Sequence, residues 1–283
     1  MTISASDLVQ DISGLITLPD VYLRINRMVE NPDSTIEDIA KAISQDPSFT
    51  MRLLKIANSA LYSFPSSVNT VSRAVTIIGT SQIHNLALSM SVAKSFDGLP
   101  NDLVSMENFW KHSLLCALSA RILARQAGRC DPEALFTAGL LHDIGELIIF
   151  NRLSGLARKA LTLVLDTMDE MSVSEAEYEV MGFDHGDVGG ELARQWKLPP
   201  LLEECIAYHH HIENAKRYPR ETALTHIANI FSQMAELDTL DSSDVPPINP
   251  RSWEITGLTE ESMEPTVREA QAEIAEVTQL FLA

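Results

Sequence analysis

Apolar residues recur along most of the chain with the spacing of amphipathic α-helices. A clear case is the segment 36–43, whose apolar residues occupy the i, i+3, i+4 and i+7 positions of one helix face: Ile36, Ile39, Ala40 and Ile43. Runs in which β-branched and polar residues alternate, as they do in half-buried strands, are absent from the sequence. The pattern therefore predicts an all-α fold with essentially no sheet.

Several predicted helices carry recognisable start signals. Asp46-Pro47 and Asp131-Pro132 each place a capping aspartate before a proline, which is favoured at the first position of a helix. Ser34 and Glu37 have the spacing of a capping box. In the second half, the periodicity predicts helices over residues 105–127, 132–152, 154–170, 173–181, 185–196, 199–210 and 220–236.

These patterns divide the chain into four segments. We expect an N-terminal helical lobe, a second helical lobe, an acidic connection and a C-terminal helix, at residues 1–100, 101–235, 236–265 and 266–283. Residues 236–266 hold eight acidic residues against a single base, Arg251, and several prolines interrupt them. Such a composition is typical of a long connection that is partly disordered or draped over the surface.

Composition and charge narrow the class of protein. Of the 283 residues, 45% are apolar and 21% are charged, which is ordinary for a folded soluble domain. The net charge of −18, from 21 basic and 39 acidic residues, argues against nucleic acid or a membrane surface as a partner. The three cysteines show no Cys-x-x-Cys spacing, and the N-terminus has no signal-peptide pattern, so we expect a reduced, cytoplasmic protein.

The histidines are the candidate chemical groups. An adjacent pair, His142-Asp143, offers an imidazole and a carboxylate, a combination that suits zinc, iron, manganese or cobalt. Four more histidines fall at predicted helix segments on either side of this pair: His112, His185, His209 and His210. In a helical bundle these side chains can converge on one metal site. The alternative is that His112 and His185 are partly buried packing residues and that residues 209–211 form a solvated run.

Two stretches of the N-terminal half resemble signatures of a known family. They are DPSFTMRLLKIANSA, residues 46–60, and VSRAVTIIG, residues 71–79. Both resemble the HDOD family, the HD-related output domain of the HD superfamily, and the resemblance covers about residues 15–235. It implies a multi-helix HD-superfamily bundle with an N-terminal helical lobe, and a role in bacterial signalling or regulation.

The second lobe is also similar to the HD-GYP phosphodiesterases, which hydrolyse cyclic di-GMP at a two- or three-metal centre. Matched residue by residue, the resemblance implies a set of metal ligands: His112, His142, Asp143, His185, His209 and His210. It implies a catalytic role for the pair His142 and Asp143 as well. The cofactor would be one or two divalent transition metal ions, namely iron, manganese or zinc.

The chain departs from the HD-GYP pattern in three places. Asn229 stands where the final ligand aspartate of the superfamily would fall, and His226 is an alternative ligand on nearly the same helix face. Glu146 replaces the lysine that follows the HD pair. The loop after His210 lacks both glycines of the family motif, which are Ala215 and Arg217 here. We therefore do not expect turnover of cyclic di-GMP.

Two functions follow from these observations. The first is a signal-transduction output module that acts by association with a signalling protein and carries a metal-binding but degenerate HD site. The alternative is a metal-dependent phosphohydrolase acting on a phosphoester or nucleotide, that is, on a phosphorylated small molecule. The sequence leaves open whether the protein is an enzyme.

Overall fold

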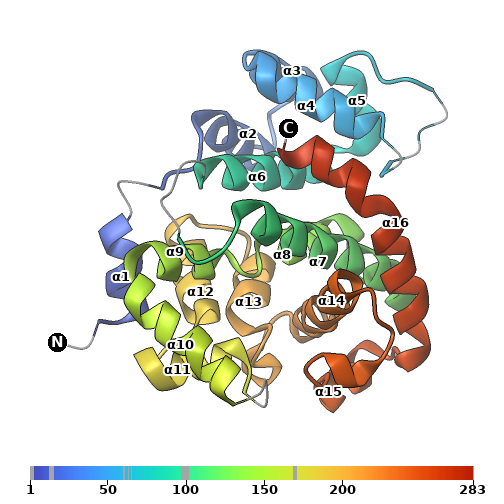
Figure 1. Cartoon of the computed structure of the whole chain (residues 1–283). Helices are drawn as coiled ribbons and strands as arrows, with labels where there is room; N and C mark the ends of the chain where they lie inside the picture. The colour runs from blue at the N-terminus through green and yellow to red at the C-terminus, as the bar shows by residue number, and fades with distance from the viewer. Residues whose placement is uncertain are drawn as a thin grey trace. The chain divides into compact units, whose positions relative to one another are not determined.

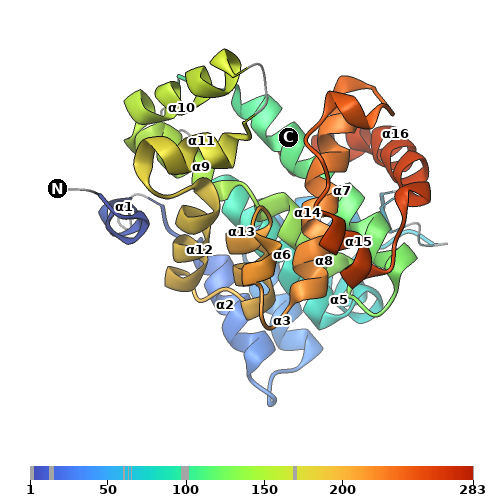
Figure 2. The ribbon, with the colours of Figure 1, turned by 90° about the horizontal axis from the view of Figure 1, so that it is seen from below.

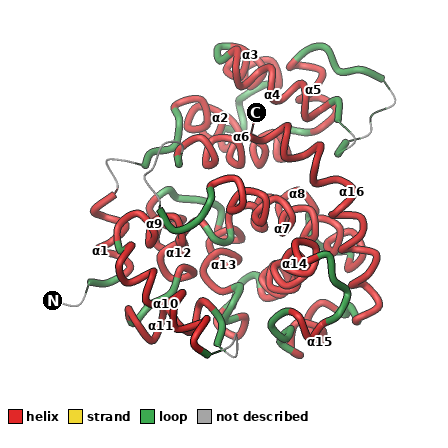
Figure 3. The backbone as a smooth tube through the Cα atoms, viewed as in Figure 1, coloured by secondary structure: helices red, strands yellow, loops and turns green. Residues whose placement is uncertain are grey.

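The structure is a computed structural model, and the part of the chain that it describes is helical. It describes residues 3–12, 16–59, 61–62, 64, 66–96, 102–167 and 171–282. In these ranges the regular elements are helices, α1 to α16 with three short 3₁₀ turns, and there is no strand (Figures 1 and 3). The predicted all-α fold is confirmed.

The chain forms two compact units. Unit 1 contains residues 1–16 and 98–271, and unit 2 contains residues 17–97 and 272–283. The predicted boundary between residues 100 and 101 lies outside the described residues. The division into four segments stays a prediction.

Unit 2 is built from five helices and the end of α16. The helices are α2 (Asp20–Glu30), α3 (Ile36–Ser44), α4 (Pro47–Ala57), α5 (Val71–Ile78) and α6 (Thr80–Ser95). Helices α2 and α3 pack on one another, and α6 packs on α2 and α5. Their shared core is mainly aliphatic, and Ile25, Leu53 and Ile83 are fully buried in it.

Local capping defines where the helices of unit 2 begin. Asp46 caps α4 by accepting a hydrogen bond from the Phe49 amide, as the sequence predicted. The capping box of α3 lies one residue later than predicted, because Thr35 and Asp38 exchange the bonds that we expected from Ser34 and Glu37. The shift places Ile39 and Ile43 in the core and leaves Ile36 exposed.

Unit 1 contains the remaining helices. They are α1 (Ala5–Ile12), α7 (Met106–Ala127), α8 (Pro132–Leu141), α9 (Ile144–Arg152), α10 (Ser154–Asp166), α11 (Val173–Met181), α12 (His185–Gln195), α13 (Pro200–Tyr208), α14 (Pro219–Leu237), α15 (Pro250–Thr256) and the first part of α16 (Met263–Leu282). Helix α7 packs along α8 and α14, while α12 packs on α9 and α13 (Figure 2). Residues 168–170, the end of one predicted helix, lie outside the described residues.

The predicted continuous helix over 132–152 is wrong at its centre, where the His142-Asp143 pair interrupts it. Asp143 has φ −100° and ψ 12°, outside the helical region, and α9 begins at the next residue. The Glu146 amide donates to the Asp143 carbonyl, which closes a tight turn. The pair therefore lies at a corner between α8 and α9, with both side chains free to point inward.

Three glycines allow the helices around this corner to approach closely. A Cβ on Gly145 would lie 2.0 Å from the His185 carbonyl oxygen, and a Cβ on Gly139 would lie 2.8 Å from the Ala117 Cα. On α12, a Cβ on Gly189 would lie 2.6 Å from Ile206 of α13. These contacts bring α8 close to α7, α9 close to α12, and α12 close to α13.

The acidic segment 236–266 is more ordered than the sequence suggested. It contains α15, which packs on α14 and buries Ser252 and Thr256. The guanidinium of Arg220 on α14 donates to the Ile255 carbonyl at the end of α15. Within the described residues, no helix combines the length and the apolar character that crossing a bilayer requires.

Candidate metal centre

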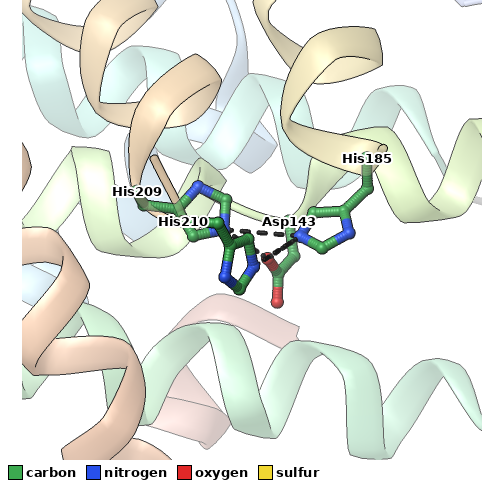
Figure 4. Close-up of side chains that lie close together, drawn as sticks. All are labelled: Asp143, His185, His209 and His210. Carbon is green, nitrogen blue, oxygen red and sulfur yellow. Dashed lines mark hydrogen bonds and ion pairs between the residues drawn. The ribbon is translucent and has the colours of Figure 1, made fainter. Parts of the chain in front are cut away.

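The carboxylate of Asp143 lies at the centre of a cluster of histidines. Oδ2 of Asp143 is 3.0 Å from Nε2 of His142 and 3.4 Å from Nε2 of His112. Oδ1 is 3.4 Å from Nε2 of His185 and also 3.4 Å from Nε2 of His209. Nε2 of His210 completes the group, 3.0 Å from Nε2 of His185 (Figure 4). All six residues that the sequence proposed as ligands are thus brought together.

The cluster consists of two groups that share Asp143. One group contains His112, His142 and Asp143, and the other contains Asp143, His185, His209 and His210. In each group, one potential ligand atom per residue lies within 4.8 Å of all the others. Because each carboxylate oxygen faces a different group, Asp143 would be shared by the two groups if each held an ion.

Four of the histidines are oriented by an acceptor behind the ring. Nδ1 of His142 bonds to the Gly139 carbonyl at 2.8 Å, and Nδ1 of His209 bonds to the Ile206 carbonyl at 3.0 Å. For His185 and His112 the acceptors are carboxylates: Glu177 on α11 at 2.7 Å and Glu236 on α14 at 3.1 Å. An acceptor at Nδ1 fixes the tautomer that leaves the Nε2 lone pair free, as in protein metal sites.

Two buried atoms at the centre have charged or polar neighbours but no contact with hydrogen-bond geometry. They are Nε2 of His142, whose side chain is fully buried, and Oδ1 of Asp143. Buried polar atoms are nearly always satisfied by protein or solvent, so an unsatisfied pair of this kind needs an explanation. A divalent cation would satisfy both, and imidazole and carboxylate are suitable donors for it. The residues present therefore fit a metal ion.

Burial and mutual repulsion keep two of the histidines neutral. Burial lowers the pKa of His142, an effect that Asp143 only partly offsets. Burial lowers the pKa of His210 well below its usual value, and His209 and His185 lower it further. Burial alone would raise the pKa of Asp143, but the neighbouring histidines lower it well below 3.8. An ionised carboxylate and neutral imidazoles are the protonation states that a metal ion requires.

The two histidines that are bonded to glutamates behave differently. Burial opposes the charge on His112, yet its contacts with Asp143 and Glu236 raise its pKa to about 10. Burial also lowers the pKa of His185, but Glu177 and Asp143 have the larger effect and raise this pKa well above 6.5. In the absence of metal these two rings hold protons that partly offset the charge of the nearby carboxylates, and a bound cation would have to displace those protons.

Glu146 lies at the edge of this cluster, close to Glu177 and His185. Burial, together with repulsion from Asp143, raises the pKa of Glu146 to about 8. The residue therefore adds a largely protonated carboxyl where the HD-GYP enzymes have a lysine. No cation takes the place of that lysine at position 146.

Sequence reasoning missed Glu177 and Glu236. Their roles depend on contacts between helices, since Glu236 lies 124 residues from His112 in the sequence. Glu177 is only eight residues before His185, but its acidic neighbours on α11 gave no reason to single it out. Its burial is the distinguishing feature, because its side chain is only 2% exposed.

The two alternative ligand positions on α14 have other contacts. Nδ1 of His226 donates to the His209 carbonyl, and Nε2 accepts the Asn249 amide, so both ring nitrogens are occupied. The side-chain oxygen of Asn229 accepts from Gln233, one turn further along the helix. The α14 carboxylate that reaches the cluster is that of Glu236.

The loop after His209 and His210 lacks both glycines of the HD-GYP motif, and hydrogen bonds to Glu204 hold it in place. The carboxylate of Glu204 accepts the backbone amides of Arg217 and Tyr218 just before α14 begins. His211, the third histidine of the run, turns away from the cluster and lies 3.3 Å from Asp184, the N-cap of α12. Only the first two histidines of the run contribute to the centre.

Fold and site together define an HD-superfamily protein, and comparison with family models identifies the branch. The model described as "HDOD domain" matches residues 15–212. The chain therefore belongs to the HDOD family, as its two N-terminal signatures predicted.

Similar proteins are known in several bacteria. A curated "Uncharacterized protein" of Treponema pallidum (strain Nichols) is 27% identical over 215 residues, which are 75% of this chain and 40% of that protein. The chain thus spans less than half the length of this relative. A crystal structure of an HDOD domain protein with unknown function from Geobacter sulfurreducens is 26% identical, covers 99% of both chains and has a TM-score of 0.72. A "Putative phosphohydrolase" from Shewanella amazonensis SB2B is 24% identical, with 99% and 100% coverage and a TM-score of 0.76.

Proposed function

We propose that this protein is a metal-binding regulatory module that transmits a signal by association with a partner protein. The observation that carries the metal site is the convergence of five histidine Nε2 atoms around Asp143, with four of the rings held from behind through Nδ1. Membership of a family named for an output role supports the regulatory part of the proposal. We place this module in bacterial signalling, in the cytoplasm.

The ligand set favours a borderline transition ion over calcium or magnesium. Five imidazoles and one carboxylate suit iron, manganese or zinc, whereas the hard alkaline-earth ions prefer all-oxygen sites. The group with His185, His209 and His210 offers four protein ligands, and the group with His112 and His142 offers three. We therefore expect the four-ligand group to hold its ion more tightly and to fill first.

The second candidate function is hydrolysis of a phosphoester at the same centre. It is favoured by the shared position of Asp143, whose two oxygens face two separate groups of histidines. A pair of ions in such a site polarises a phosphate oxygen and lowers the pKa of a bound water. The name of the Shewanella neighbour points to the same reaction class. The carboxyl of Glu146 and the altered loop after His210 argue against cyclic di-GMP as the substrate.

The decisive experiment measures metal content. Protein purified without an affinity tag is stripped with a chelator, reconstituted separately with iron, manganese and zinc, and assayed by elemental analysis. We expect one to two ions per chain, and less than about half of that in His209→Ala. A content below about 0.2 ion per chain with all three metals would contradict the proposal.

A second assay separates the two functions. The reconstituted protein is incubated with bis(p-nitrophenyl) phosphate, and release of nitrophenol is followed in the wild type and in Asp143→Asn. Metal-dependent release that is lost in the variant would favour the hydrolase. A loaded centre without release would favour the regulatory module.

A further inference from the structure

Helix α10 leaves its large apolar residues at the surface of unit 1. Only two of its 13 residues are buried, and both are alanines, Ala157 and Ala160. Its four leucines and its valine are all at least partly exposed, and Leu165 is 73% exposed. The helix packs beside α9 and α11 (Figure 2). A surface helix normally buries a stripe of such residues, so the outer side of α10 is a candidate interface.

An open groove runs along this side of α10. Its volume is about 500 Å³, and six of its seven lining residues belong to α10, while Val180 of α11 is the seventh. The α10 positions in the groove extend from 155 to 166, which is about 16 Å along a helix axis. Six exposed residues share this side of the helix through their three- and four-residue spacing: Gly155, Arg158, Lys159, Thr162, Leu165 and Asp166. The groove therefore has the length and the direction of a site for another helix.

The charges on this side have an order along the helix. Arg158 and Lys159 precede Thr162 by four and three residues, and Asp166 follows it by four. Two such helices that run antiparallel about a two-fold axis at Thr162 place the bases of each copy at the level of Asp166 of the other. A parallel pair would set like charges opposite each other. A partner with charges of one sign would be attracted at one end of the groove and repelled at the other.

We propose that α10 is the dimer interface between two copies of this chain, packed antiparallel about Thr162. Lys159 of each copy pairs with Asp166 of the other, and the aliphatic stem of Arg158 covers the exposed Leu165. The Thr162 hydroxyl donates to the Arg158 carbonyl of its own helix, so it needs no polar partner at the axis. The pairing lets α10 cover the leucines that unit 1 alone leaves at the surface.

Sedimentation equilibrium across a range of protein concentrations tests the dimer. We expect a monomer–dimer equilibrium in which the dimer has twice the chain mass of 31.3 kDa. Thr162→Arg puts two guanidinium groups on the axis and should leave the protein monomeric. Lys159→Glu and Asp166→Lys should each weaken the dimer about 10-fold. The variant with both changes restores the charge pair in reverse, so its affinity should return to within about threefold of the wild type.

Disulfide cross-linking tests the register of the two helices. Cys116 and Cys205 are buried, and Cys130 is changed to serine in both variants. Thr162→Cys should form a covalent dimer on mild oxidation, because two residues at the axis of packed helices come within disulfide reach. Gly155→Cys should not, since its two copies would lie about 21 Å apart along the antiparallel helices.

The charge control is Lys41→Glu, which makes the same change at an exposed position of α3 in unit 2. It should change the dimer affinity by less than about twofold, and thermal melts should show that every variant is folded. The proposal is overturned by a wild type that stays monomeric at all concentrations, which would leave the groove to a different protein. It is also overturned by a dimer that Thr162→Arg leaves intact, or by equal cross-linking of the two cysteine variants. Neither measurement involves the metal centre, so the outcome is independent of the proposed function.

Discussion

One oxygen of Glu177 accepts two hydrogen bonds from His185. The backbone amide donates at 2.8 Å and the ring Nδ1 at 2.7 Å, both to Oε2. The first bond ties the start of α12, which Asp184 caps, to α11, and the second fixes the tautomer of the first residue of α12. A single buried carboxylate thus orients both the helix and the ring that directs Nε2 at Asp143.

Replacing Glu177 should weaken metal binding without removing a ligand. In Glu177→Gln the side chain keeps its shape, but the group that accepts from Nδ1 of His185 loses its charge. The Nε2 atom of His185 then becomes a weaker ligand for a metal ion. We expect the affinity to fall by about 10–100-fold, measured by competition with a chelator of known affinity. The matched control is Glu179→Gln on the same helix, which is exposed and should leave the affinity unchanged.

The packing of α9 on α12 should be equally necessary for the centre. In Gly145→Ala the new Cβ would fall 2.0 Å from the His185 carbonyl and 2.7 Å from the Gly189 amide, and backbone atoms cannot rotate away. We expect a loss of at least about 2 kcal/mol in the free energy of unfolding and a reduced metal content. Gly155→Ala, where a Cβ meets nothing within 4 Å, should change stability by no more than about 1 kcal/mol. Equal stabilities of the two variants would contradict this account.

The six candidate ligands could be predicted from the sequence, but the turn and the carboxylate that position them could not. His142 and Asp143 are adjacent, and the other four histidines fall at the ends or on the faces of strongly periodic helices, so residue type and spacing made them candidates. The resemblance to the HD-GYP enzymes then implied the full ligand set. The corner at Asp143 was missed because Leu140, Leu141 and Ile144 continue the apolar pattern through it. Glu236 was assigned to an acidic connection, since a count of charges cannot show that one carboxylate meets a histidine 124 residues away.

The contribution of α14 to the centre can be tested by two substitutions. Asn229 stands where the final ligand aspartate of the superfamily would fall, so Asn229→Asp should tighten metal binding if this position faces the metal. The structure instead places Glu236 against His112 and pairs Asn229 with Gln233, so Glu236→Gln should have the larger effect. We expect a roughly 10-fold or greater weakening in Glu236→Gln and little change in Asn229→Asp, from chelator competition. Tighter binding by Asn229→Asp would restore position 229 as the final ligand position.

His226 should prove to be a structural residue and not a ligand. Its ring joins the His209 carbonyl to the Asn249 amide, and burial lowers its pKa to about 4, so it remains neutral at physiological pH. His226→Ala leaves both backbone groups without this partner, and we expect a loss of about 2–4 kcal/mol in the free energy of unfolding in urea. The metal content per folded chain should not change. A loss of one ion without a loss of stability would reverse this assignment.

Glu146 should make the metal-free protein less stable as the pH rises. Burial and the charge of Asp143 raise its pKa to about 8, against 4.5 for an exposed glutamate. Between these pH values the folded chain holds a proton that the unfolded chain has released. The free energy of unfolding therefore falls as the pH rises from 4.5 to about 8. Glu146→Gln removes the ionisation, so it should be nearly neutral at pH 5 and should stabilise the chelator-treated protein by more than about 1 kcal/mol at pH 9. Urea unfolding at the two pH values measures this difference, with the exposed Glu179→Gln as control. An effect of the same size at both pH values would show that the carboxyl of Glu146 ionises as it does in water.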